Sequence, residues 1–266
     1  MNGIFIVPTV RCNLLLGLLD SIERSRYCQW DLAVFFQAYT QAELEFVSLH
    51  PMFKRMAYTY YTAGLTPPFQ CRYKMFGDVA GKYDAYISLD DDMELWEERT
   101  DFQPAIEKAQ ERDAGIVSCN WVRTKSPALI SRARYEPGVF IEQALVYMGG
   151  GMVFDNKVIE ATLLADNLPY LFDDVQYALI AYLAGYRNYR YLGSMLFHHI
   201  MSTGGIKRLY SERALVLPNE NYITVRPCAQ IYDIDNNYFI PKPKDLTAAA
   251  HVEHNINRER MAAQSQ

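Results

Sequence analysis

The chain has 266 residues, half of them hydrophobic and 21% charged, which is typical of a globular protein with a sizeable core. Its net charge of −5 gives no overall attraction to nucleic acid or anionic membranes, although a local basic patch stays open. The five cysteines are scattered without Cys-x-x-Cys spacing, which disfavours zinc and a disulfide framework and fits a reducing, cytoplasmic location. We expect no secretory signal and no membrane span, because the apolar runs are short.

The N-terminal part of the chain predicts alternating strands and helices. Residues 3–10 form an apolar run typical of a buried strand, and residues 11–25 repeat leucine and isoleucine with a helical period. A second buried strand over residues 31–37 completes a βαβ unit, which implies a parallel sheet. The remaining elements expected here are a helix over 43–62 that His50-Pro51 breaks or restarts, a helix over 71–80 and a strand over 83–89.

The alternation continues to about residue 200. Residues 125–138 are polar and predict irregular structure, and Gly185 is a plausible helix C-cap. The elements expected are helices over 101–112, 156–165 and 173–185, strands over 115–122, 152–154 and 189–197, and an edge strand over 140–148. We expect one catalytic domain over 1–215, with halves 1–95 and 96–215, and a partly disordered C-terminal extension over 216–266.

Three adjacent carboxylates, Asp90, Asp91 and Asp92, follow the apolar run that ends at Leu89. Like charges in a row repel, so solvent or a cation must hold them. Alternation along a strand would point Asp90 and Asp92 the same way at the carboxyl end of the strand, where α/β proteins bind ligands. Oxygen ligands of this kind suit Mg²⁺ or Mn²⁺. The alternative is a solvated acidic turn that caps a helix over 93–99.

The order of motifs along the chain resembles that of GT-A glycosyltransferases, most closely the inverting family 2 type, over about residues 3–200. The residues that carry the resemblance are Ile4-Phe5-Ile6-Val7-Pro8-Thr9 and the helix after them, Arg72, Leu89-Asp90-Asp91-Asp92, Gly149-Gly150-Gly151, Phe172-Asp173-Asp174-Val175 with the helix that ends at Ala184-Gly185-Tyr186-Arg187, and His198. The resemblance implies an α/β fold of the GT-A (Rossmann-like) type, with a mostly parallel central sheet flanked by helices.

The resemblance also assigns roles to these residues. Asp90 and Asp92 would hold Mn²⁺ or Mg²⁺ against the diphosphate of a nucleotide-sugar, and His198 or His199 would complete the metal shell. Only one of the two histidines should do so, because adjacent strand residues face opposite ways. Asp174 would be the general base that deprotonates the acceptor hydroxyl. Asp at a helix start is also a common N-cap, which is the structural alternative for this residue.

Further residues are expected to line the donor and acceptor sites. Asp173 and Trp121 would contact the acceptor, and Lys207 and Arg208, beside Gly204-Gly205, would form a lid over phosphate. The family usually ends its second strand in acidic residues that touch the nucleobase; here Gln37 would hydrogen-bond the base and Tyr39 would stack on it. The expected donor contacts are Pro8, Thr9, Arg11, Gln37, Tyr39, Arg72, Lys74, Asp90, Asp91, Gly149, Gly150, Gly151, Lys207 and Arg208.

The function predicted is transfer of a sugar from a nucleotide-sugar, with a UDP-sugar as the expected donor, to an acceptor hydroxyl with inversion. The acceptor is either a carbohydrate or lipid-linked glycan, or a hydroxyl on a modified base in DNA. Basic residues gathered at the site would favour DNA; the candidates are Arg123, Lys125, Arg132, Arg134, Lys207 and Arg208. A nucleotidyltransferase would usually show a Gly- and Arg-rich loop after the first strand, which residues 9–13 lack. A non-catalytic binding module is disfavoured by the joint presence of Asp90, Asp92 and Asp174.

Overall fold

The computed structural model of the protein describes residues 1–66, 68–122, 134–143, 151–164, 177–178, 180–182 and 184–199. The strands are β1 (Gly3–Thr9), β2 (Asp31–Gln37), β3 (Met56–Thr62), β4 (Ala85–Ser88), β5 (Met93–Leu95), β6 (Ala114–Val122), β7 (Phe140–Gln143), β8 (Met152–Phe154) and β9 (Arg187–His198). The helices are α1 (Cys12–Arg24), α2 (Gln41–Ser48), the 3₁₀ helix η1 (Pro51–Arg55), α3 (Pro68–Val79), α4 (Gln103–Gln110) and α6 (Asn156–Leu164).

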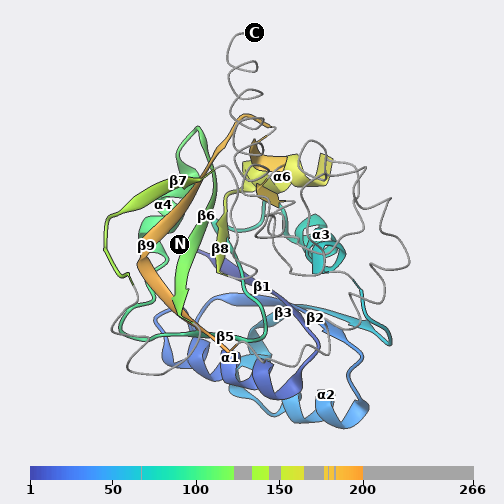
Figure 1. Ribbon diagram of the computed structural model, residues 1–266. Helices are drawn as coiled ribbons and strands as arrows, with labels where there is room; N and C mark the ends of the chain where they lie inside the picture. The colour runs from blue at the N-terminus through green and yellow to red at the C-terminus, as the bar shows by residue number, and fades with distance from the viewer. Residues whose placement is uncertain are drawn as a thin grey trace, which may run out of the picture.

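The described strands form one mixed sheet in the order β3-β2-β1-β4-β8-β6-β9-β5, and β7 pairs with the first part of β9, at the other end of that strand from β5 (Figure 1). Strands β1 to β4 are parallel, and β6 runs parallel to β9. Strand β8 lies antiparallel between β4 and β6, and β5 and β7 are antiparallel to β9. The expected α/β fold with a mostly parallel sheet is therefore confirmed.

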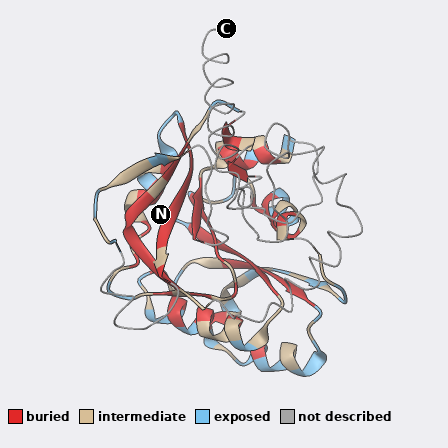
Figure 2. Ribbon diagram, in the orientation of Figure 1, coloured by how far each residue is buried: buried red, intermediate tan, exposed pale blue. Residues whose placement is uncertain are grey.

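Helices cover both faces of the sheet, so the central strands are buried on both sides (Figures 1 and 2). Every residue of β1 is buried, which explains its unbroken apolar run. One core cluster lies between the sheet and helices α1, α2 and α4; the other lies beneath α3, α6 and the helical residues 177–178 and 180–182. The carboxyl ends of β1 and β4 lie side by side between these layers, because the two strands are parallel neighbours.

Several expected elements are confirmed, and two expectations are wrong. The strand over 31–37 and the helix that follows β1 lie where the periodicity predicts them. The helix expected over 43–62 ends at Ser48, and Met56–Thr62 is the parallel edge strand β3, because alternating Tyr and Thr residues favour a sheet with one half-buried face. The alternative helix over 93–99 is also wrong, since Met93–Leu95 pairs with β9 as β5.

The described part of the C-terminal half agrees with the sequence prediction. Residues 177–178 and 180–182 are helical, and Gly185 ends this helix with a positive φ of 89°, as a C-cap does. The Gly185 and Tyr186 amides donate to the carbonyls of Tyr182 and Ala181, both at 2.9 Å. The expected extension over 216–266 lies outside the described residues. No helix within the described ranges is long and apolar enough to cross a membrane. The four cysteines there are free thiols.

Candidate functional site

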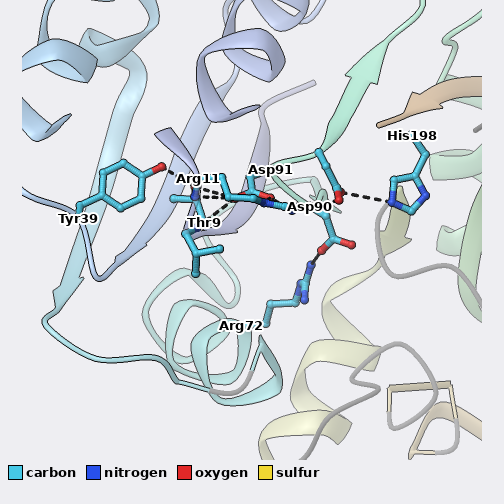
Figure 3. A network of polar contacts seen from close by, with 9 residues as sticks. Thr9, Arg11, Tyr39, Arg72, Asp90, Asp91 and His198 are labelled. Carbon is cyan, nitrogen blue, oxygen red and sulfur yellow. Dashed lines mark hydrogen bonds and ion pairs between the residues drawn. The ribbon is translucent and has the colours of Figure 1, made fainter. Parts of the chain in front are cut away.

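The carboxylates of Asp90 and Asp91 leave the end of β4 in different directions, toward Arg72 and Arg11 (Figure 3), and that of Asp92 contacts Arg11 and His198. Strand β4 stops at Ser88, and the Met93 amide donates to the Asp90 carbonyl at 3.1 Å, which closes a turn over the three acids. Strand alternation therefore does not decide where Asp90 and Asp92 point, contrary to the expectation from the sequence. Each carboxylate instead has its own partner on a neighbouring element.

Asp91 is buried and holds the loop between β1 and α1. Its Oδ2 accepts hydrogen bonds from the Thr9 hydroxyl (3.0 Å) and from the amides of Val10 (3.0 Å) and Arg11 (3.1 Å). Its Oδ1 accepts from the Arg11 Nε at 3.1 Å and from Nη2 of the same side chain. Both oxygens are thus engaged by the chain, so the expected contact between Asp91 and a donor would require these bonds to open.

Asp91 also supplies a negative charge at the start of α1, where Arg11 is the N-cap residue and makes no side-chain cap of its own. A carboxylate at this position satisfies free amides and favours the helix dipole. Burial raises the pKa of Asp91, while the Arg11 charge and the hydrogen-bond donors oppose that rise, since each of them favours the carboxylate.

Arg11 connects Asp91 to Asp92. Its Nη2 lies 3.0 Å from Oδ2 of Asp92 while the same guanidinium contacts Asp91. Burial lowers the pKa of Arg11, but the two carboxylates outweigh burial, so the pKa lies above its ordinary value. Arg11 therefore remains a cation beside the acidic turn.

Asp92 faces His198 at the end of β9. The His198 Nε2 lies 3.3 Å from Oδ1 of Asp92, and neither that oxygen nor the His198 Nδ1 has a hydrogen-bond partner although both are buried. Burial raises the pKa of Asp92, but His198 and Arg11 outweigh it, so the pKa is lowered and the carboxylate form is favoured. The ring of Trp121 packs edge-on against His198, with centroids 5.0 Å apart.

His199 points away from this pair. Its Nε2 lies 2.7 Å from Oε2 of Glu94, and its amide donates to the Asp92 carbonyl at 2.8 Å. The two adjacent histidines thus diverge, as strand alternation predicts, and His198 is the one beside Asp92. The sequence interpretation overlooked Glu94. Asp92 and Glu94 flank the apolar Met93, and this polar–apolar–polar alternation is the strand pattern that could have identified Glu94.

Asp90 pairs with Arg72, a fully buried arginine on α3 whose Nε donates to the Ser88 hydroxyl at 2.6 Å. Arg72 thus lies at the acidic turn, where the sequence places it. Lys74 is exposed two residues later, with its Nζ 5.4 Å from the centre of the Tyr60 ring, and its donor role stays a prediction.

Asp92 and His198 fit a divalent cation better than Asp90 does in this arrangement. An imidazole and a carboxylate oxygen without a partner are ligands that Mn²⁺ accepts. Asp90 is turned toward Arg72, so it would have to release that pair to join them. Within the described ranges, a second set of acidic and histidine side chains has ligand atoms close enough together to share a metal ion. Its members are Asp20, Glu23 and His50.

That second group does not fit a metal. The His50 Nδ1 accepts a hydrogen bond from the Met52 amide at 3.1 Å, so Nε2 carries the proton in the neutral ring. Nε2 lies 3.0 Å from Asp20 and donates to it, and Asp20 and Glu23 are exposed. His50 therefore acts as a hydrogen-bond donor here rather than as a metal ligand.

The end of β2, where a nucleobase is expected, carries a strained residue. Ala38 has a φ of 55°, a conformation that non-glycine residues adopt at a cost and that is often found at functional sites. On one side of it, Gln37 is buried and its Oε1 accepts from the Thr66 amide at 2.7 Å. On the other side, the Tyr39 and Thr9 hydroxyl oxygens are 2.7 Å apart. Because the Thr9 hydrogen goes to Asp91, Tyr39 is the donor; burial raises its pKa and keeps it neutral.

Gly151 joins the strands behind the acidic turn. Its amide donates to the Ser88 carbonyl at 2.7 Å and its carbonyl accepts from the Cys119 amide at 2.8 Å, with a φ of 77°. Pro8 lies buried within β1. The roles expected for Gly149, Gly150, Asp173, Asp174, Lys207 and Arg208 remain predictions, because these residues lie outside the described ranges.

The sheet order and the helices on both faces of the sheet are those of the GT-A fold, which solved structures of other proteins share. The solved structures that this chain resembles include GalNAc-T7 with UDP, GalNAc and Mn²⁺ (TM-score 0.58, 12% identity, 90% of this chain and 53% of that chain). S. aureus TarS 1-349 with UDP-GlcNAc gives a TM-score of 0.59 at 12% identity, over 84% of this chain and 64% of that one. The mannosyltransferase PcManGT from Pyrobaculum calidifontis with GDP-Man and Mn²⁺ gives 0.58 at 16% identity, over 84% and 63%.

These matches establish the fold, and the chain spans about half to two thirds of the length of these three proteins. No protein-family model matches the sequence, and no curated protein matches it either.

Proposed function

We propose that the protein is a metal-dependent glycosyltransferase that moves a sugar from a nucleotide-sugar to an acceptor hydroxyl. The observation that carries this proposal is the pair of Asp92 and His198, in which a buried carboxylate oxygen without a hydrogen-bond partner faces an imidazole nitrogen at the carboxyl edge of a GT-A sheet. Unsatisfied buried polar atoms are costly, and a cation between Oδ1 of Asp92 and Nε2 of His198 would satisfy that carboxylate oxygen. GalNAc-T7 and PcManGT, which share the fold, were solved with Mn²⁺.

The residues around the pair suit a diphosphate. Asp92 and His198 would hold Mn²⁺ or Mg²⁺, with Asp90 joining them once Arg72 turns to the substrate. The metal would neutralise charge on the departing nucleoside diphosphate. The guanidinium groups of Arg11 and Arg72 place two positive charges beside the same carboxylates. A guanidinium group can bind two phosphate oxygens at once.

The finer assignments rest on the resemblance to the inverting family 2 type. Asp174 would be the general base, and the product would have the opposite anomeric configuration to the donor. A UDP-sugar is the expected donor, although Gln37 already uses its acceptor oxygen on Thr66. If the base is uracil, the side-chain NH₂ of Gln37 would donate a hydrogen bond to a carbonyl oxygen of the base.

A thermal-shift panel tests the proposal. UDP-, GDP- and CDP-sugars are compared with and without Mn²⁺, because a ligand that binds only the native state raises its melting temperature by mass action. We expect one nucleotide class to stabilise the protein in the presence of Mn²⁺, and Asp92→Asn to lose that shift. Asp20→Asn, which changes an acid outside the site, should keep it. Equal melting temperatures with every ligand would contradict the proposal.

A further inference from the structure

Arg11 contacts one oxygen of Asp92, the proposed metal ligand, and leaves the other oxygen open. The Nη2 of Arg11 lies 3.0 Å from Oδ2 of Asp92. Oδ1 of the same carboxylate is buried without a hydrogen-bond partner and lies 3.3 Å from Nε2 of His198. The two oxygens of Asp92 are therefore not equivalent, because Oδ1 faces an imidazole and Oδ2 faces a guanidinium.

Asp91 holds the Arg11 side chain in place. Oδ1 of Asp91 accepts from Nε of Arg11 at 3.1 Å and from Nη2, and Oδ2 accepts from the Arg11 amide at 3.1 Å (Figure 3). The Asp91 side chain is 4% exposed, so its contact with Arg11 is largely shielded from water. A carboxylate that accepts two hydrogen bonds from one guanidinium fixes the orientation of that guanidinium. Arg11 therefore has a defined position beside Oδ2 of Asp92.

The contact with Arg11 restricts how Asp92 can bind a cation. Ca²⁺ binds carboxylates through one or both oxygens at about 2.3–2.6 Å, whereas Mg²⁺ requires a nearly ideal octahedron with bonds of about 2.0–2.1 Å. The two oxygens of one carboxylate are too close together to occupy neighbouring corners of such an octahedron. A cation bound to both oxygens of Asp92 would share Oδ2 with the guanidinium, and the two positive charges would repel each other. A cation bound to Oδ1 alone avoids this repulsion.

We propose that Arg11 is a positioning residue that makes Asp92 a ligand through one oxygen, and thereby selects Mn²⁺ and Mg²⁺ over Ca²⁺. The inference rests on the proposed function, because it takes Asp92 and His198 as ligands of the metal that accompanies the nucleotide. The imidazole of His198 adds to the same preference, since Ca²⁺ favours oxygen ligands. That contribution stays the same when Arg11 is replaced, so the two effects are separable.

The test compares the affinity for UDP, or for the nucleotide that the thermal-shift panel selects, in saturating Mn²⁺ and in saturating Ca²⁺. Isothermal titration calorimetry measures both, and the ratio of the two affinities is the readout. Arg11→Lys keeps the positive charge, but its single nitrogen lacks the fork that contacts both acids, so it should stay with the buried Asp91 and release Asp92. We expect the native protein to bind more tightly with Mn²⁺. The ratio should fall by about tenfold in Arg11→Lys, the lower end of the loss in metal affinity when a partner of a metal ligand is removed.

The ratio separates metal selection from the other roles of Arg11. A contact between Arg11 and phosphate, or a purely structural role, would change both affinities alike and leave the ratio as it is. Mn²⁺ and Ca²⁺ also carry the same charge, so the field of a nearby cation acts on both equally. The matched control is Arg24→Lys on α1, where Arg24 lies 3.8 Å from Glu94, an acid outside the proposed metal site; this variant should keep the native ratio.

Melting temperatures without metal establish that each variant is folded. If Arg11→Lys is unfolded, the double variant Arg11→Gln with Asp91→Asn takes its place, because replacing both charges of a buried pair costs less than removing one of them. The double variant also lacks the guanidinium at Oδ2 of Asp92, so its ratio should fall in the same way.

Three results would overturn the inference. They are equal affinity of the native protein with Mn²⁺ and Ca²⁺, a native ratio in the folded Arg11 variant, and an equal fall of the ratio in Arg24→Lys. The proposed function fails separately, if the native protein binds no nucleotide with either ion. Binding that depends on Mn²⁺, together with an unchanged ratio in the Arg11 variant, would refute the role of Arg11 and leave the proposed function standing.

Discussion

The replacement Asp91→Asn should destabilise the protein strongly, although it changes only one atom of a side chain. The amide nitrogen must face hydrogen-bond donors whichever way the side chain turns, because Oδ1 and Oδ2 both accept from the β1–α1 loop. Removing one partner of a buried ion pair costs about 3–5 kcal/mol. We expect the lower value, about 3 kcal/mol, because Arg11 keeps Asp92 at 3.0 Å.

This loss of about 3 kcal/mol corresponds to a decrease of about 6–12 °C in melting temperature, at roughly 2–4 °C per kcal/mol for a chain of this size. Differential scanning calorimetry measures it, with urea unfolding as a second readout. Asp20→Asn is the matched control, because the Asp20 side chain is 55% exposed and should leave the melting temperature unchanged. If the Asp91→Asn and Asp20→Asn proteins have the same melting temperature, Asp91 does not hold the loop between β1 and α1.

Three further predictions address the strands behind the site, the buried thiol and the base. Gly151→Ala should lower the free energy of unfolding by about 1–2 kcal/mol, because alanine is strained at a left-handed φ. The added methyl group, 3.0 Å from Leu196, should increase this loss, and unaltered urea unfolding would contradict the prediction. Burial raises the pKa of Cys119 to about 12, so at pH 8 iodoacetamide should label Cys28 in the folded protein and spare Cys119, as peptide mass spectrometry reports. Because the unfolded thiol ionises near pH 8.5, the Cys119 contribution to stability should fall as the pH rises above that value. Asp174→Asn should lower turnover by about 10²–10⁴-fold with unchanged donor affinity, and NMR of the product should show inversion; near-normal turnover would reduce Asp174 to a helix cap.

The sequence predicts the fold where its periodicity is unambiguous. The apolar run of β1, the leucine period of α1 and the run of β2 define a βαβ unit by local pattern alone. Residues 56–62 defeat this approach, because a helix could restart after His50-Pro51 and a short edge strand with one half-buried face has no apolar run to exclude it. Its identity depends on pairing with β2, which is a tertiary interaction.

The site is predictable in its residue types but not in their roles. The sequence identifies the acidic turn, Arg72 and a late histidine, and the structure brings these together. It does not indicate that Asp91 caps a helix from another strand, because that depends on the parallel pairing of β1 and β4. The choice between His198 and His199 likewise depends on where β5 pairs.

The paired variants His198→Gln and His199→Gln test the central claim most directly. Binding of UDP, or of the nucleotide that the thermal-shift panel selects, is measured by calorimetry with and without Mn²⁺. We predict that His198→Gln weakens Mn²⁺-dependent binding by more than about 10-fold, because the loss of a ligand beside Asp92 should cost at least as much as the loss of a partner outside the metal shell. His199→Gln should bind as the native protein does, since His199 contacts Glu94. Equal binding by both variants and the native protein, or a loss confined to His199→Gln, would contradict the metal site and the function built on it.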